Sequence, residues 1–280
     1  MKGRYCLITG ATSGIGYCTA LNLARMGTFV VVGGRSRDRA VKVVEDIRLS
    51  CANKEVNFIT ADLSDQSQVR YFAREYVKRF PRLDVLVNNA GAIFFKRRIS
   101  RDGLEKTLAL NYCAPFLLTH LLLDLLKQSG SGRIINVSSA AHERATIDFE
   151  DLGGKKRYGA MRAYGQSKLA LILFTYELAR RLGSDATVTV NALHPGFVAT
   201  NFVGNNGWPI KLLAPVIKLF ALPPEKGAIA STYLASSHEV AGVTGKYFVN
   251  KHAVASSPRS YDEIVARRLW DITARITGID

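Results

Sequence analysis

The 280-residue chain carries 38 Lys and Arg against 23 Asp and Glu, a formal net charge of +15, and 48% of its residues are hydrophobic. This length and apolar content can fill one large α/β domain or two small ones. The basic residues are dispersed, without a long run interleaved with aromatic residues, which argues against a nucleic-acid partner and for a solvated basic surface. A small phosphate-rich ligand would also benefit from the positive field.

The cysteines and the apolar stretches limit where the protein works. The cysteines lack the spacing of metal ligands, so we expect reduced, structural thiols, no metal site and a cytoplasmic location. A predicted strand follows almost directly after Met1, which leaves no room for a signal peptide or N-terminal membrane anchor. The longest apolar stretch, 114–126, is interrupted by polar residues and is too short to span a bilayer. Peripheral contact of the basic surface with an anionic membrane stays open. The four cysteines are Cys6, Cys18, Cys51 and Cys113.

Short β-branched runs alternate with amphipathic stretches of helical length, which predicts a parallel sheet with helices on both faces. The runs are apolar on both faces, as buried parallel strands are. No repeat or linker interrupts the pattern, so we expect a single domain over 1–280. The predicted strands are 5–8, 29–32, 56–59, 85–87, 134–137, 188–192 and 246–249. The predicted helices are 15–26, 37–50, 66–79, 102–128, 162–182 and 260–276.

Two segments depart from this alternation. Residues 141–162 are polar and contain glycine, and they separate a strand from the helix that follows. Residues 201–224 begin with Gly204, Gly207 and Pro209 and continue as an apolar stretch. The second segment is either an ordinary packing helix or a mobile lid over an apolar substrate.

Tyr164 and Lys168 are spaced i, i+4 at the start of a predicted helix, which places both side chains on one helix face. A nearby ammonium favours a phenolate and lowers the pKa of the phenol. The pair is therefore a candidate proton donor and acceptor. The spacing alone does not select it, because it recurs in Tyr158/Arg162 and Tyr176/Arg180.

A glycine-rich string, Thr9–Gly16, follows the first predicted strand and opens the first helix. Glycines allow a tight turn and a close approach to a pyrophosphate, and the helix N-terminus offers unpaired N–H groups. A purely structural turn is the alternative, and the position directly after strand one favours dinucleotide binding.

The end of the second predicted strand indicates which dinucleotide binds. An NAD-selective site would place a carboxylate there, but the sequence has Arg35 after two glycines. A guanidinium suits a 2′-phosphate and can stack on adenine, so NADP(H) is favoured over a chance surface arginine.

Taken together, these strings resemble the short-chain dehydrogenase/reductase family over nearly the whole chain. The resemblance implies a Rossmann-type, doubly wound parallel sheet of about seven strands. It places the cofactor half near 1–130 and the substrate loops near 93–99, 141–160 and 201–222. The strings that carry the resemblance are Thr9–Gly16, Asp62-Leu63, Asn88-Asn89-Ala90-Gly91, Asn111, Ser138-Ser139, Tyr164 with Lys168, and Pro195-Gly196 followed by Thr200.

The family also implies a role for each of these residues. Tyr164 would be the acid/base, Ser139 would orient the substrate, and both would contact it. Lys168 would bind the nicotinamide ribose, and Asn111 would support a proton-relay water. Asp62 and Leu63 would lie near the adenine, Asn89 near the adenosine ribose and Thr200 near the carboxamide. The implied cofactor-binding residues are Gly10, Ser13, Gly14, Ile15, Gly16, Arg35, Asp62, Leu63, Asn89, Tyr164, Lys168 and Thr200.

The long stretch from Ser139 to Tyr164 and the C-terminal strings around Tyr247 and Trp270 resemble the retinol dehydrogenase-like branch. That branch implies a lipophilic aldehyde, ketone or alcohol as substrate. The apolar helices 104–128 and 162–182 either form the seam of a homodimer or pack on the sheet.

The leading hypothesis is an NADP(H)-dependent oxidoreductase. The alternative is a catalytically idle NADP(H)-sensing or regulatory protein on the same fold. Such sensors tend to lack the Tyr/Lys pair that this chain keeps. Two histidines lie near the expected site: we expect His194 to pack structurally, and His142 either lines the substrate pocket or packs as well.

Overall fold

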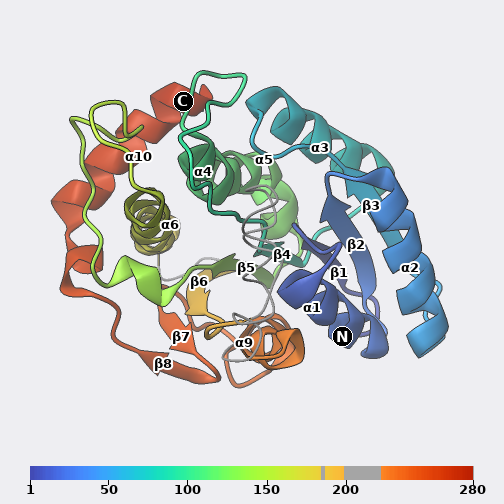
Figure 1. The fold of residues 1–280 in the computed structure, drawn as a ribbon. Coiled ribbons are helices and arrows are strands. Elements are labelled where there is room, and N and C mark those ends of the chain that lie inside the picture. Colours follow the sequence, from blue (N-terminus) through green and yellow to red (C-terminus); the bar gives the residue numbers. More distant parts are fainter. Residues whose placement is uncertain (184–186, 199–221, 280) are drawn as a thin grey trace.

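A computed structural model describes residues 1–183, 187–198 and 222–279. These residues form one eight-stranded sheet in the order β3-β2-β1-β4-β5-β6-β7-β8, with helices on both faces (Figure 1). The pairs from β3 to β7 are parallel, and only β8 is antiparallel to its neighbour. The predicted doubly wound α/β sheet is therefore confirmed. Its strands are β1 (Tyr5–Ile8), β2 (Phe29–Gly34), β3 (Val56–Thr60), β4 (Val85–Asn88), β5 (Gly132–Val137), β6 (Val188–His194), β7 (Tyr247–Val249) and β8 (His252–Val254).

Local sequence signals explain where the helices begin. Asp65 accepts hydrogen bonds from the amides of Ser67 and Gln68 and so caps the N-terminus of α3, which covers the predicted range. Asp262 caps α10 in the same way through the amide of Val265. The helices are α1 (Gly14–Arg25), α2 (Arg37–Cys51), α3 (Gln66–Arg79), α4 (Lys106–Leu108), α5 (Ala114–Gln128), α6 (Ala160–Leu182), α9 (Pro224–Ser236) and α10 (Glu263–Thr277).

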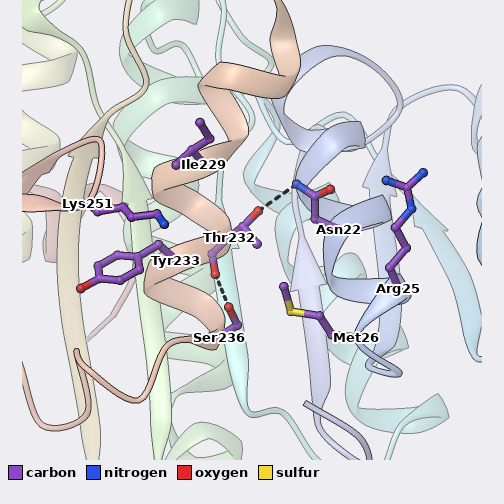
Figure 2. Close-up of a pocket in the computed structure, with 8 residues that line it drawn as sticks. All are labelled: Asn22, Arg25, Met26, Ile229, Thr232, Tyr233, Ser236 and Lys251. Atoms are coloured by element: carbon purple, nitrogen blue, oxygen red, sulfur yellow. Dashed lines mark hydrogen bonds between the residues drawn. The ribbon is translucent and has the colours of Figure 1, made fainter.

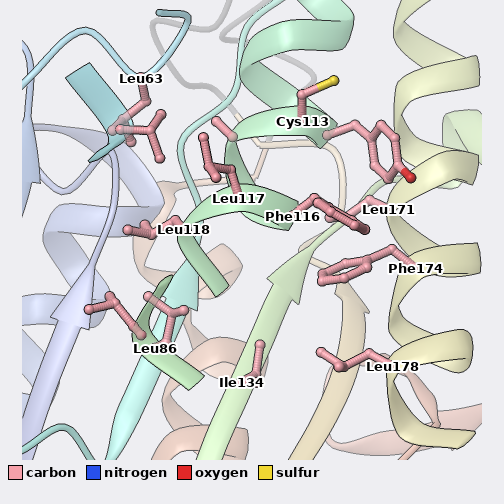
Figure 3. Close-up of a cluster of buried hydrophobic side chains, with 14 of the residues drawn as sticks. Leu63, Leu86, Cys113, Phe116, Leu117, Leu118, Ile134, Leu171, Phe174 and Leu178 are labelled. Atoms are coloured by element: carbon pink, nitrogen blue, oxygen red, sulfur yellow. The ribbon is translucent and has the colours of Figure 1, made fainter. Parts of the chain in front are cut away.

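Two hydrophobic cores lie on opposite faces of the sheet. One core joins the sheet to α3, α5, α6 and α10, and Figure 3 shows Phe116 of α5 facing Phe174 of α6 above Ile134 of β5. The other core joins the sheet to α1, α2 and α9. Three of the four cysteines are buried and all four are free thiols, as expected.

The structure differs from the predicted elements in three places. Helix α9 was not predicted, because it is rich in small residues and shows no apolar stripe. Strand β8 was not predicted either, because it has only three residues. The single helix predicted over 102–128 begins only at Lys106 and contains a π-helical turn, Ala109–Cys113, between α4 and α5. The last predicted helix begins at Glu263, after a short 3₁₀ turn over Pro258–Tyr261.

The π-helical turn joins α4 and α5 into one helical run, Lys106–Gln128, and corrects the expectation of a short apolar stretch. By length and composition this run could cross a membrane, but 67% of its apolar window is buried inside the fold. In the part of the chain that the structure describes, it therefore serves as a core helix packed against the sheet.

Helix α10 packs along the outer side of α6 (Figure 1), and its Trp270 also reaches α5. The Trp270 ring lies 5.0 Å from Phe116 and 5.7 Å from Phe174, measured between ring centroids. The Arg181 guanidinium lies over the Trp270 ring, 4.2 Å from its centroid. The aromatic face that α5 and α6 share is thus covered by a segment of the same chain.

Candidate active site

The predicted site residues of the first half gather at the carboxyl edge of the sheet, where β1 and β4 are neighbours. The strand order reverses at this point, and ligands of open α/β sheets bind in the crevice that results. Gly10 has φ +66°, and a Cβ on it would lie 2.8 Å from the Cα of Ala90 in the loop after β4. Only glycine therefore lets these two loops approach so closely.

Asn89 holds the glycine-rich loop in place. Its Nδ2 donates to the carbonyls of Thr9 at 2.8 Å and Gly10 at 3.2 Å. A Cβ on Gly16 would lie 2.5 Å from the same nitrogen. The loop thus uses the side-chain amide donors of Asn89. The side-chain oxygen of Asn89 is the group that could bond to the predicted ribose.

The N-terminus of α1 fits an anionic ligand. Ser13 precedes the helix in an extended conformation, and its side chain makes no capping bond. The first-turn amides of Gly14, Ile15 and Gly16 point out of the helix without intrahelical acceptors, at the positive end of its dipole. The Ile15 side chain lies against α9, where a Cβ on Gly227 would meet it at 2.9 Å. Only the backbone of Ile15 is therefore oriented toward the crevice.

Arg35 and Asp62 follow β2 and β3, which are adjacent in the sheet. Arg35 is exposed. Burial acts to raise the pKa of Asp62, but hydrogen bonds from Ser64 and the charges of Lys106 and Arg35 lower it overall. Asp62 is therefore ionised, whereas the neighbouring Leu63 side chain is buried in the core.

Tyr164 and Ser139 meet at the carboxyl end of β5. Tyr164, in the first turns of α6, is only 8% exposed. Burial raises the pKa of Tyr164 to about 12, and a hydrogen bond with Ser139 acts in the opposite direction. The Ser139 Oγ also accepts from the amide of Ala141 at 3.2 Å, which directs its own O–H away from the loop. The two hydroxyl groups are thus paired.

Lys168 lies on the same face of α6, but its ammonium is not aimed at the phenol oxygen. Its Nζ donates to the carbonyl of Val137 at 2.8 Å and lies 5.6 Å from the centroid of the Tyr164 ring. Burial lowers the pKa of Lys168 to about 8. The expected lowering of the Tyr164 pKa by Lys168 is therefore wrong, because burial raises that pKa instead.

Asn111 lies in the π-helical turn and is fully buried. Its Oδ1 accepts from the amide of Ala92 at 2.9 Å, and its Nδ2 donates to the Ala92 carbonyl at 3.0 Å and to the Ser167 Oγ at 3.0 Å. Its side chain therefore fixes the loop after β4 against α6. The π-helical turn interrupts the i→i−4 ladder at this position, an irregularity that is frequent at functional sites.

The structure gives both histidines structural contacts. The His194 Nδ1 accepts from the amide of Ala140 at 3.3 Å, as expected of a packed residue. His142 is fully buried, and its two ring nitrogens bond to the Ser139 carbonyl and the Ser257 amide. The alternative that His142 lines the substrate pocket is therefore wrong.

Two of the three predicted substrate loops are tied together. The Tyr158 hydroxyl donates to the Phe94 carbonyl at 2.5 Å, and the Arg97 Nε donates to the Gly153 carbonyl at 2.8 Å. The loops near 93–99 and 141–160 therefore form one wall beside the site. Thr200 and nearly all of the loop 201–222, with its proposed lid, lie outside the described residues.

A separate surface groove lies between α1 and α9, away from these residues (Figure 2). Its volume is about 420 Å³, and a hydrogen bond from Asn22 to Thr232 crosses it. The residues that line it include none of the predicted site residues, so it is no part of the candidate active site.

Comparison with known proteins accounts for this arrangement. The profile of the short chain dehydrogenases matches residues 4–208. The chain belongs to the short-chain dehydrogenase/reductase family. Human retinol dehydrogenase 13 is 42% identical over 286 residues, which cover 100% of this chain and 86% of that protein. Human polyprenol dehydrogenase is 39% identical, and the match covers 99% of this chain and 86% of that protein. These relatives place the chain in the retinol dehydrogenase-like branch.

Solved structures of short-chain dehydrogenases and similar proteins share the fold. A crystal structure of a protein from Mycobacterium paratuberculosis matches with TM-score 0.80 and 31% identity, covering 99% of this chain and 94% of that one. The Pseudomonas aeruginosa RhlG/NADP active-site complex matches with TM-score 0.69 and 29% identity, covering 89% and 94%. Family membership makes the protein an oxidoreductase of alcohols and carbonyls that uses a nicotinamide cofactor.

Sequence reasoning gave no individual role to three residues that the structure places in the site. Gly91 leaves room for Asn111 and Lys168, since a Cβ there would lie 3.3 Å from the Asn111 Oδ1 and 3.4 Å from the Lys168 Nζ. Thr9 accepts through Oγ1 from the amides of Asn89 and Ala90. Ser167 receives the bond from Asn111. All three lie inside the strings already quoted, and that position is the only sequence signal for them.

Proposed function

We propose that the protein is an NADP(H)-dependent oxidoreductase that interconverts a lipophilic aldehyde or ketone with its alcohol. The observation that carries the proposal is the pairing of Tyr164 with Ser139 beside the buried Lys168, at the same edge of the sheet as the glycine-rich loop that opens α1. The NADP preference and the substrate class go beyond what family membership gives.

The residues present fit a phosphorylated dinucleotide. Gly10 and Gly16 let the glycine-rich loop pack tightly against Ala90 and Asn89, and the N-terminus of α1 presents amides to a pyrophosphate. Arg35 stands exposed at the end of β2, where a 2′-phosphate of the adenosine ribose would lie. Buried Lys168 would bond the nicotinamide ribose. The bound dinucleotide would supply the hydride.

The chain's own residues supply the proton and the positioning. A carbonyl oxygen placed between Ser139 and Tyr164 would accept hydrogen bonds from both hydroxyl groups, which stabilise the negative charge that develops on it. Because burial raises the pKa of Tyr164 to about 12, its phenol is protonated at neutral pH and can donate. The phenol is thus in the protonated form that reduction of a carbonyl needs, and oxidation of an alcohol needs its phenolate form.

The lipophilic substrate is inferred from the surroundings of the site. The loop after β4 presents Phe95, which is 45% exposed, and the loop after β6 presents Phe197, which is 63% exposed. The relatives named retinol and polyprenol dehydrogenase support the same substrate class. Apolar side chains at the mouth of the site favour a substrate that buries apolar surface.

A panel of medium-chain aldehydes, all-trans-retinal, simple ketones and the matching alcohols, each with NADPH and NADH, tests the proposal. We expect aldehyde reduction with NADPH, followed by nicotinamide absorbance, with higher kcat/KM for longer apolar chains. Tight binding of NADPH without turnover of any member would instead support the idle sensing protein. Turnover that favours NADH would overturn the cofactor assignment alone.

A further inference from the structure

His142 joins the loop of Ser139 to the C-terminal part of the chain. It lies in a short 3₁₀ turn directly after Ser139 and is fully buried. Its Nδ1 lies 2.7 Å from the Ser139 carbonyl, and its Nε2 lies 3.1 Å from the backbone nitrogen of Ser257. The ring also packs on Tyr247 of β7, with 5.0 Å between centroids.

The partners of the ring determine its tautomer. The backbone N–H of Ser257 can only donate, so Nε2 must be the acceptor. A carbonyl can only accept, so Nδ1 carries the hydrogen and donates a hydrogen bond to the Ser139 carbonyl. The neutral ring with its proton on Nδ1 satisfies both bonds at once, and no other form does.

The far end of this bridge is itself fixed to α6. The Tyr176 hydroxyl of α6 bonds to the Ser256 Oγ at 2.7 Å, and Ser256 bonds to the Ser260 Oγ at 2.6 Å. Ser260 donates in turn to the Ser257 carbonyl at 2.6 Å. Because α6 also carries Tyr164, the two hydroxyl groups of the site are connected by a second route through the C-terminal segment.

We propose that His142 is a positioning residue, which holds the backbone of Ser139 at the distance from Tyr164 that the reaction needs. The inference rests on the proposed function, because it gives Ser139 its role in orienting the carbonyl. The position of the Ser139 Oγ follows the Ser139 backbone that carries it. The same oxygen also accepts a hydrogen bond from the Ala141 amide in the adjoining turn. A small shift of the Ser139 carbonyl therefore moves the hydroxyl, and misplacement by about 1 Å can cost on the order of 100-fold in rate.

His142→Phe is the main test, because it keeps the ring packed against Tyr247 and removes both hydrogen bonds. Ser257→Ala is the matched control: it keeps the backbone N–H and removes a hydroxyl that is buried without a partner among the described residues. His142→Asn is the conservative variant, since its amide N–H can still reach the Ser139 carbonyl.

With a carbonyl that wild type reduces, we expect His142→Phe to lower kcat about 10- to 100-fold per NADPH-binding molecule, with KM for NADPH within about twofold. His142→Asn should recover part of the loss, and Ser257→Ala should match wild type. Equal kcat for His142→Phe and wild type would overturn the proposal. So would a loss that follows only the fraction of folded protein, as a purely structural role predicts.

Hydrogen exchange separates this inference from the proposed function. The amides of His142, Glu143 and Ala145 bond within the turn that follows Ser139. In His142→Phe these amides should exchange about tenfold faster than in wild type, and in Ser257→Ala they should not. Absence of turnover in wild type would remove the proposed function, and unchanged exchange in His142→Phe would remove the positioning bridge independently.

Discussion

Replacing Lys168 by methionine should stabilise the free protein while abolishing its activity. Burial lowers the pKa of Lys168 from 10.5 to about 8, so at neutral pH the folded state holds an ammonium that burial disfavours. One pKa unit corresponds to about 1.4 kcal/mol, so the burial penalty is roughly 3 kcal/mol. The bond from Nζ to the Val137 carbonyl offsets about 1 to 2 kcal/mol of this. Methionine keeps the buried stem and removes the charge, so we expect a net gain of about 1 to 2 kcal/mol at pH 7.

The pH dependence gives the sign of the effect. Below about pH 8 lysine is protonated in both states, and the penalty is present in full. Between about 8 and 10.5 the folded lysine loses its proton before the unfolded one, so wild type gains stability as the pH rises. The advantage of Lys168→Met should therefore shrink over this window.

Urea unfolding of wild type and Lys168→Met at intervals from pH 6 to pH 10 measures the difference. Lys106→Met is the control, because Lys106 is only half-buried and pairs with Asp62 at 3.6 Å. It should change the free energy of unfolding by less than about 1 kcal/mol. A Lys168→Met protein that is less stable than wild type at pH 7, or a gain that does not change with pH, would refute this reasoning.

Three further substitutions test the site. Tyr164→Phe should lower turnover on the order of 100-fold or more and leave NADPH binding near wild type; Tyr176→Phe, which removes only the bond to Ser256, should lose far less, and the reverse result would identify the wrong tyrosine. Arg35→Asp should erase or invert the preference for NADPH, mainly through KM, by about 10- to 100-fold in kcat/KM; an unchanged preference would place cofactor selection elsewhere. Gly91→Ala should lower kcat by pressing a Cβ against the Asn111 Oδ1, which would lie 3.3 Å away, and an unchanged kcat would contradict this.

The arrangement of the sheet could be predicted because its signals are local. Each buried strand is a short apolar run, and α3 follows a capping aspartate, Asp65, that fixes its first residue. Helix α9 escaped prediction because it packs through small residues, as at Gly227, where a Cβ would meet Val198 at 2.7 Å. Such close packing depends on what lies opposite, which a pattern along one segment does not contain.

The sequence could predict that Tyr164 and Lys168 lie together, but not the electrostatics that result. The spacing of Tyr164 and Lys168 places them on one face of α6 and suggests attraction between them. The structure turns the ammonium toward the Val137 carbonyl and buries both groups, so the pKa of the phenol rises. Likewise, the role of His142 depends on Ser257, which lies in a distant part of the sequence. These properties arise from tertiary contacts and desolvation, and neither is encoded in spacing.

The placement of α10 has a consequence for how the enzyme responds to dilution. The aromatic rings of α5 and α6 find their cover in Trp270 of the same chain, and Arg70 of α3 donates to the Thr277 carbonyl at the end of α10. Contacts within one chain form by a unimolecular step, whereas contacts between subunits weaken as the protein concentration falls. The support that α10 gives to the helix carrying Tyr164 and Lys168 is therefore the same at nanomolar as at micromolar concentration.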